Sequence, residues 1–174
     1  MADGQHSKRL SLDTNVLLDI AAGYDFAVGF RDTFQKMGYS LHCVPTVLAE
    51  LNALMSDEDE ETRKRATTAL DNLILWDISP ITLTDAEKKY RTNFINIADA
   101  RNVLPDGEIN DARILSETAI ANIPVLVTSD TGILDADQDA LALAFNDSGL
   151  LAVRVLTAYR LWKTYFKPST KKKR

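Results

Sequence analysis

Short apolar runs alternate with longer segments of helical periodicity along this chain of 174 residues. The apolar runs predict strands at residues 9–13, 41–44, 125–130 and 150–157. The periodic segments predict helices at residues 14–23, 25–37, 45–55, 62–76, 84–98, 108–122 and 158–166, with a short helix between the last two strands. Strands that alternate with helices predict an α/β protein with a parallel sheet covered on both faces.

Apolar stripes support several of these helices. The helix at 62–76 has a stripe of Ala66, Leu70, Leu73 and Ile74, and the helix at 84–98 has one of Tyr90, Phe94 and Ile97. In the last helix, helical spacing favours packing or a dimer contact over base stacking for Tyr159, Trp162, Tyr165 and Phe166. We find no internal repeat, so we expect one domain at residues 9–166 between a disordered N-terminus (1–8) and a basic tail (167–174).

The charge distribution excludes a general polyanion binder. The net charge is −5, but six of the 20 basic residues lie in the last twelve positions, where there is no acid. The rest of the chain carries 14 basic and 25 acidic residues, a net charge of −11. A nucleic-acid partner would therefore need a local basic patch or bound metal ions.

The remaining composition indicates a cytoplasmic protein that does not enter a membrane. No apolar run approaches the ~20 residues of a membrane span, and the N-terminus lacks the apolar stretch of a secretory signal. The single cysteine, Cys43, cannot form an internal disulfide, which suits a reducing compartment.

Four acidic residues lie where packing alone would not favour them. Asp13 and Asp130 end predicted strands, and the carboxyl ends of parallel strands meet at one edge of a sheet. Glu50 lies beside the apolar stripe of the helix at 45–55, and Asp111 borders the buried face of the helix at 108–122. Each could have a local role, as a helix cap for Asp13 and Asp130, a solvent-facing side chain for Glu50 or a dipole partner for Asp111. These separate roles do not explain the joint placement.

Convergence of these carboxylates would be costly without a cation. Two carboxylates about 4 Å apart repel by roughly 4 kcal/mol at an effective dielectric of about 20. Oxygen ligands favour Mg²⁺ or Mn²⁺, and the separated His6 and His42 do not suggest zinc. Carboxylate-held Mg²⁺ or Mn²⁺, as one or two ions, is suited to phosphodiester hydrolysis.

Four segments in order resemble the PIN-domain ribonuclease family: LDTNVLLD (12–19), VPTVLAEL (44–51), NDARILSETA (110–119) and VTSDTGIL (127–134). The resemblance extends from about residue 10 to 160. It implies a three-layer α/β/α fold with a central, mainly parallel sheet of four to five strands. It also implies a Mg²⁺- or Mn²⁺-dependent endoribonuclease that hydrolyses RNA.

The resemblance assigns the metal site to Asp13, Glu50, Asp111 and Asp130, with Asp135 as a further acid. Glu108 is another candidate ligand, although the dipole of the helix at 108–122 explains its position better. Asn15, Thr128 and Ser129 match positions at which the family places polar groups around that site. Many PIN-domain proteins are VapC-type toxins of type II toxin–antitoxin pairs and many form homodimers, so an antitoxin and a second copy are the expected protein partners. Other members mature RNA.

Other functions fit this sequence less well than a nuclease does. A haloacid-dehalogenase-type phosphatase needs a second aspartate where this chain has Asn15, and a phosphoaspartate receiver needs paired acids and a late lysine. A flap-endonuclease-type DNA nuclease shares the chemistry but usually has a larger chain. The non-enzyme alternative is a PIN-like module that binds RNA or a protein without cleaving it, and such a scaffold would gain stability by losing these acids.

Overall fold

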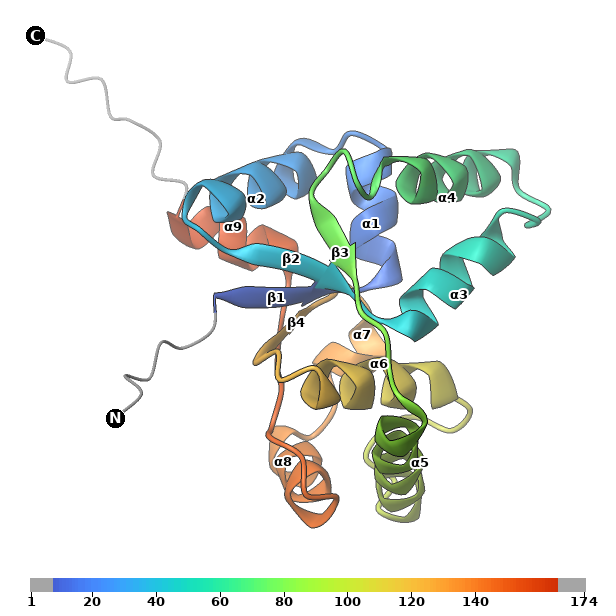
Figure 1. Ribbon diagram of the computed structural model, residues 1–174, viewed down its shortest axis with the longest axis vertical. Coiled ribbons are helices and arrows are strands. Elements are labelled where there is room, and N and C mark those ends of the chain that lie inside the picture. The colour runs from blue at the N-terminus through green and yellow to red at the C-terminus, as the bar shows by residue number, and fades with distance from the viewer. Residues whose placement is uncertain (1–7, 166–174) are drawn as a thin grey trace, which may run out of the picture.

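The computed structural model describes residues 8–165, which form a five-stranded sheet with helices on both faces (Figure 1). The strands are β1 (Arg9–Leu12), β2 (Ser40–Cys43), β3 (Ile78–Pro80), β4 (Val125–Val127) and β5 (Arg154–Leu156). Every pairing is parallel, and the spatial order is β3-β2-β1-β4-β5. The predicted three-layer α/β/α class is confirmed.

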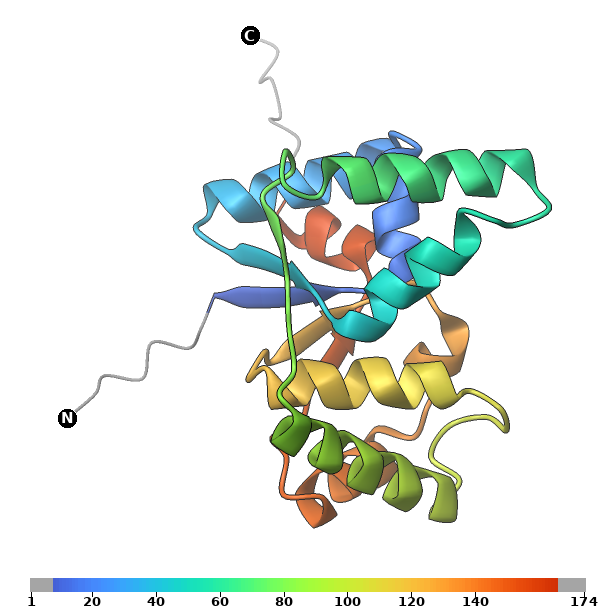
Figure 2. The ribbon, with the colours of Figure 1, turned by 45° about the vertical axis from the view of Figure 1, so that its right-hand side comes forward.

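The helices divide into two layers. They are α1 (Thr14–Ala21), α2 (Asp25–Lys36), α3 (Pro45–Leu54), α4 (Glu60–Asn72), α5 (Asp85–Ala100), α6 (Ile109–Ile120), α7 (Thr131–Leu134), α8 (Gln138–Asp147) and α9 (Ala158–Tyr165). Two views show α1, α2, α4 and α9 on one side of the sheet and α5, α6 and α8 on the other (Figures 1 and 2). None of the helices described is long and apolar enough to span a bilayer.

Local sequence explains where several helices begin. Asp59 caps α4 and Asp137 caps α8, each through a side-chain oxygen that accepts from backbone N–H groups of the first turn. Thr84 and Glu87 form a reciprocal capping box at the start of α5. Pro45 begins α3, where its missing N–H is not needed.

The core lies on both faces of the sheet. Phe30 and Phe34 of α2 are buried on one side, with ring centroids 5.0 Å apart. Phe94 of α5 and Phe145 of α8 stack at 4.6 Å on the other side. Helix α9 packs against α2, and the Tyr165 ring meets Phe34 edge-on at 5.3 Å. Tyr159 and Tyr165 nevertheless remain about half exposed, at 53% and 49%.

The strand order places a crevice beside β1. From β1, the chain builds the sheet outward through β2 and β3, then returns to the other side of β1 for β4 and β5. Leu12 of β1 pairs with Val127 of β4, so the segments that follow both strands leave the sheet side by side. Such a reversal of strand order is where open α/β sheets usually bind ligands.

Several predicted elements differ from the structure. The sequence pattern does not predict strand β3, because this strand is three residues long and contains Pro80. The proline is tolerated because β3 lies at the edge of the sheet. The expected strands at 125–130 and 150–157 are shorter, since β4 ends at Val127 before the α7 cap Asp130, and β5 spans only Arg154–Leu156. The single short helix expected between them is two helices, α7 and α8.

Two side chains assigned to apolar stripes are exposed. Helix α4 ends at Asn72, so Ile74 lies in the following turn and is 93% exposed. Tyr90 of α5 is 54% exposed, whereas Phe94 of the same expected stripe is buried. The basic tail, Phe166 and all but the last residue of the expected N-terminal extension lie outside the described residues.

Candidate active site

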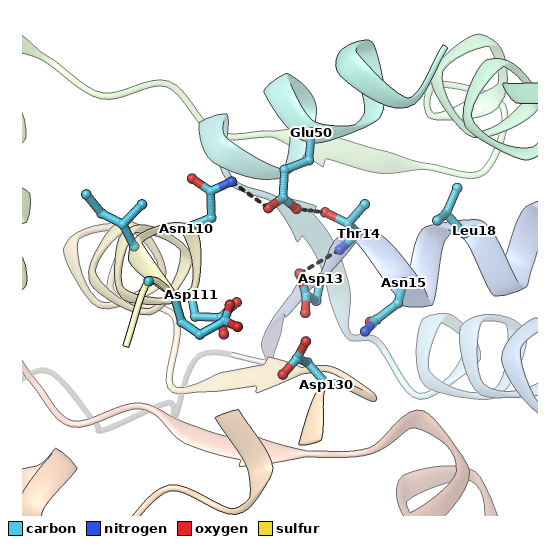
Figure 3. A pocket seen from close by; sticks show the side chains of 11 residues that line it. Asp13, Thr14, Asn15, Leu18, Glu50, Asn110, Asp111 and Asp130 are labelled. Carbon is cyan, nitrogen blue, oxygen red and sulfur yellow. Dashed lines mark hydrogen bonds between the residues drawn. The ribbon is translucent and has the colours of Figure 1, made fainter. Parts of the chain in front are cut away.

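A pocket of about 350 Å³ lies where β1 and β4 end, and the four predicted acids line it. Asp13 follows β1 and Asp130 follows β4, while Glu50 comes from α3 and Asp111 from the first turn of α6. Figure 3 shows these side chains directed toward a common space. Residues far apart in the sequence therefore meet at the carboxyl edge of the sheet.

Asp13 is held by two hydrogen bonds from different elements. Its Oδ1 accepts from the Thr14 backbone N–H at 2.7 Å, which caps α1, and its Oδ2 accepts from the Thr128 hydroxyl at 2.5 Å. Burial raises the pKa of Asp13 to about 6, against the lowering effect of these two hydrogen bonds. The negative charges of Glu50 and Asp130 also raise this pKa, which shows that the acids repel one another.

Asp130 caps α7 through Oδ1, which accepts from the Gly132 N–H at 2.7 Å and the Ile133 N–H at 3.3 Å. The capping role considered for Asp13 and Asp130 is thus confirmed, but it does not compete with a place in the pocket. In each case one oxygen makes the cap. A Cβ added at Gly132 would lie 3.0 Å from Asp130 Oδ1 and 3.7 Å from Asp111 Oδ2, so the small residue leaves room for both acids.

Glu50 is oriented by two residues that the sequence did not indicate. The Thr14 hydroxyl donates to Glu50 Oε2, and the Asn110 amide donates to Glu50 Oε1 at 3.0 Å (Figure 3). Thr14 begins α1 and Asn110 lies in the first turn of α6, so Glu50 connects three helices. Both donors line the pocket. In the sequence, the one indication of their role is that Thr14 follows Asp13 and Asn110 precedes Asp111.

Asp111 carries a negative charge that its surroundings disfavour. It is 7% exposed, and its Oδ2 is buried without a hydrogen-bond partner among the described residues. Burial raises the pKa of Asp111 to about 7, and the charges of Asp130, Glu108 and Asp13 raise it further in that order. An unsatisfied buried carboxylate oxygen is unusual in a protein and indicates a missing ligand or a functional role.

The other predicted site residues lie at different depths. Glu108 is the N-cap residue of α6 and lines the pocket, and Asn15 also lines it.

Thr128 is buried and hydrogen-bonded to Asp13, and its hydroxyl also accepts from the Asp130 N–H at 2.9 Å. Ser129 is exposed and contributes only its N–H, which donates to Asn15 Oδ1 at 3.3 Å. Asp135, at the end of α7, is exposed and does not line the pocket.

Two helix N-termini offset part of the repulsion. Helix α1 begins beside Asp13, and α6 begins with Glu108 at its cap and Asp111 in its first turn. The positive end of a helix dipole stabilises a nearby anion by about 0.3–1 kcal/mol. This is less than the repulsion expected among several carboxylates in one pocket, so the site retains a net demand for positive charge.

The donor set suits a hard divalent ion, since all four acids supply oxygen and no donor in the described part of the chain competes for Asp111 Oδ2. Among residues 8–165, no three His, Cys, Asp or Glu side chains are grouped closely enough to hold an ion as they stand. Holding an ion would therefore require these side chains to draw together within the pocket.

Comparison with known proteins supports the fold. No family model matches this chain, and no curated protein matches its sequence. Among solved structures, it is similar to the crystal structure of VapBC2 from Rickettsia felis bound to a DNA fragment from their promoter. The TM-score is 0.60 and the identity 17%, over 86% of this chain and 98% of that chain. At this identity the likeness bears on the fold alone, and it agrees with the PIN-like architecture expected from the sequence.

Proposed function

We propose that this protein is a metal-dependent ribonuclease in which Asp13, Glu50, Asp111 and Asp130 hold Mg²⁺ or Mn²⁺. The observation that carries this proposal is the convergence of the four acids on one pocket at the carboxyl edge of the sheet. They come from four separate segments, and one of them, Asp111, has a buried oxygen that no donor within residues 8–165 reaches. A protein with no use for a cation would gain stability by replacing at least one of them.

An ion held by these carboxylates would supply positive charge to offset that of a phosphodiester, and it would make a bound water more acidic. The chain's own residues prepare for this. Thr128 orients Asp13, while Thr14 and Asn110 orient Glu50, so two carboxylates are held before any ligand arrives. Partners of this kind fix the direction of a metal ligand and typically change metal affinity or activity by about 10–100-fold when removed.

The pocket's charge also determines what can enter it. Within the described residues, five acidic side chains line it and no Lys or Arg does. A phosphate would be repelled by this surface unless a divalent ion accompanied it. Activity should therefore depend strictly on added metal and cease in EDTA. RNA is the substrate class implied by the resemblance to PIN-domain ribonucleases.

A toxin role with a protein antitoxin is the second part of the proposal. The similar solved structure is of VapBC2, determined with DNA from the promoter of that pair. By this analogy we propose that a partner protein of the antitoxin type binds the present chain. We also propose a homodimer, which light scattering of the purified chain would test.

The direct test is incubation of matched single-stranded RNA and DNA with the wild-type protein in Mg²⁺, Mn²⁺ or EDTA. We expect RNA cleavage with either metal and none in EDTA. Asp13→Asn should reduce cleavage by more than about 100-fold, because a metal ligand is worth at least as much as its outer partners. Asp139→Asn, an exposed acid in the first turn of α8, is the matched control and should behave as wild type. RNA binding without cleavage in any metal would instead favour the binding-only module.

A further inference from the structure

A second cavity, of about 360 Å³, lies between α5 and α6 directly beside the carboxylate pocket. The two cavities share Gly107, Glu108 and Ile109 as lining residues. A strand with its phosphate at the carboxylate pocket would therefore have its neighbouring nucleotide next to this α5–α6 cavity. Its size is in the range of small-ligand pockets.

The lining of this cavity combines apolar surface with two unused polar side chains. Ile95, Leu104 and Pro105 provide apolar contact area, which suits the flat face of an aromatic base. Asn96 and Asp99, one turn apart on α5, supply the polar groups. Their side chains form no hydrogen bond or ion pair with other described residues, so both are available to a ligand.

We infer that the α5–α6 cavity binds the base next to the scissile phosphate and that Asp99 selects guanine, an inference that rests on the proposed ribonuclease function. A carboxylate offers two acceptors and no donor. The Watson–Crick edge of guanine presents two adjacent donors, N1–H and the N2 amino group, which match both carboxylate oxygens. Adenine, cytosine and uracil each place an acceptor beside a single donor there, and that acceptor would face the negative charge of Asp99.

Asn96 complements this arrangement because its amide can donate to guanine O6, the acceptor that adjoins N1–H. Single-stranded RNA is the substrate form that fits, since its unpaired bases expose the Watson–Crick edge and an apolar slot can take the base face. The contacts would confer a preference for cleavage beside guanine.

The experiment compares cleavage of one single-stranded RNA, with a single guanine, against the same RNA with inosine at that position. Inosine lacks only the N2 amino group. We expect cleavage beside guanine to be about tenfold faster, since a good bidentate contact discriminates by a factor of this order or more. Asp99→Asn should remove this difference, because an amide presents only one acceptor. Asp71→Asn, an exposed acid on α4, is the control and should retain it.

A second measurement separates this inference from the proposed function. Binding of guanosine and inosine to the full chain in EDTA, followed by NMR, needs no metal and no cleavage. Tighter binding of guanosine that is lost in Asp99→Asn supports the base site even if no RNA is cut. Cleavage without preference for guanine, or a preference that survives Asp99→Asn, overturns the base site and leaves the nuclease intact. Binding of N-acetyl-arginine amide in preference to guanosine also overturns it, in favour of a protein partner.

Discussion

Asp111→Asn should make the protein more stable in the absence of metal, because it removes the charge that the fold accommodates least well. The substitution keeps the shape of the side chain. It removes repulsion from Asp130, Glu108 and Asp13, and Oδ2 accepts no hydrogen bond from a described residue that the substitution could break. The new amide nitrogen can also donate to a neighbouring carboxylate.

The magnitude follows from the pKa of Asp111, which is raised from 3.8 to about 7. A shift of this size corresponds to about 4 kcal/mol when the group is fully charged, and we take half because the pocket is open to solvent and can relax. Removing a negative charge near the start of α6 also lowers the stability by about 0.3–1 kcal/mol, because that charge interacts favourably with the helix dipole. A net gain in the free energy of unfolding of about 1–2 kcal/mol remains.

The sign depends on pH in a defined way. Because the pKa of Asp111 is higher in the folded state, its contribution to stability is fully present below pH 3.8 and is lost as the pH rises through about 7. The advantage of Asp111→Asn should therefore be largest at pH 8 and smaller by about 1–2 kcal/mol at pH 5.

Urea denaturation in EDTA, at pH 8 and pH 5, measures both effects. Asp139→Asn is the matched control, since Asp139 also lies in the first turn of a helix but is exposed, and it should change stability by less than about 0.5 kcal/mol. A variant that is less stable than wild type at pH 8, or whose advantage does not change with pH, would refute the view that Asp111 is held against repulsion.

Three further substitutions test contacts between helices, including one contact that orients Glu50. Glu117 is fully buried, pairs with Arg91 at 2.8 Å and accepts hydrogen bonds from the N–H and hydroxyl of Thr46 in α3. Glu117→Ala should therefore lower the free energy of unfolding, measured by chemical denaturation, by about 3–5 kcal/mol. A loss below about 1 kcal/mol would contradict this. Gly29→Ala should lower the melting temperature, because the new Cβ would lie 2.6 Å from Trp162 Nε1 and such overpacking costs about 1–3 kcal/mol. An unchanged melting temperature would mean that α9 can shift to make room for the methyl group. Thr14→Val removes the hydroxyl that donates to Glu50. It should reduce metal-dependent cleavage by about 10–100-fold while the protein stays folded. Full activity would show that Glu50 does not depend on this hydrogen bond.

The four acids could be predicted because two separate features of the sequence pattern identify them, the ends of strands and the apolar stripes of helices. Asp13 and Asp130 stand where buried strands end, and parallel strands bring such ends together. Glu50 and Asp111 stand beside apolar helical stripes, which indicates that they face inward. The structure brings all four to one pocket, whereas the ion itself remains a proposal.

The parts that could not be predicted depend on how separate elements approach one another. Thr14 and Asn110 orient Glu50 only because α1, α3 and α6 meet, and no pattern within any one helix indicates that contact. Ile74 belongs to the helical stripe by spacing, but α4 ends two residues before it. Strand β3 exists because β2 provides a partner for three residues that have little strand character of their own.

Mn²⁺ binding, followed by electron paramagnetic resonance of the free ion, tests most directly whether the four carboxylates act together. We expect wild type to bind Mn²⁺ at the pocket, and we expect Asp13→Asn, Glu50→Gln, Asp111→Asn and Asp130→Asn each to weaken binding at least about tenfold. Asp139→Asn should leave it unchanged. Equal binding by wild type and all four pocket variants, each shown to be folded, would contradict a shared ion site.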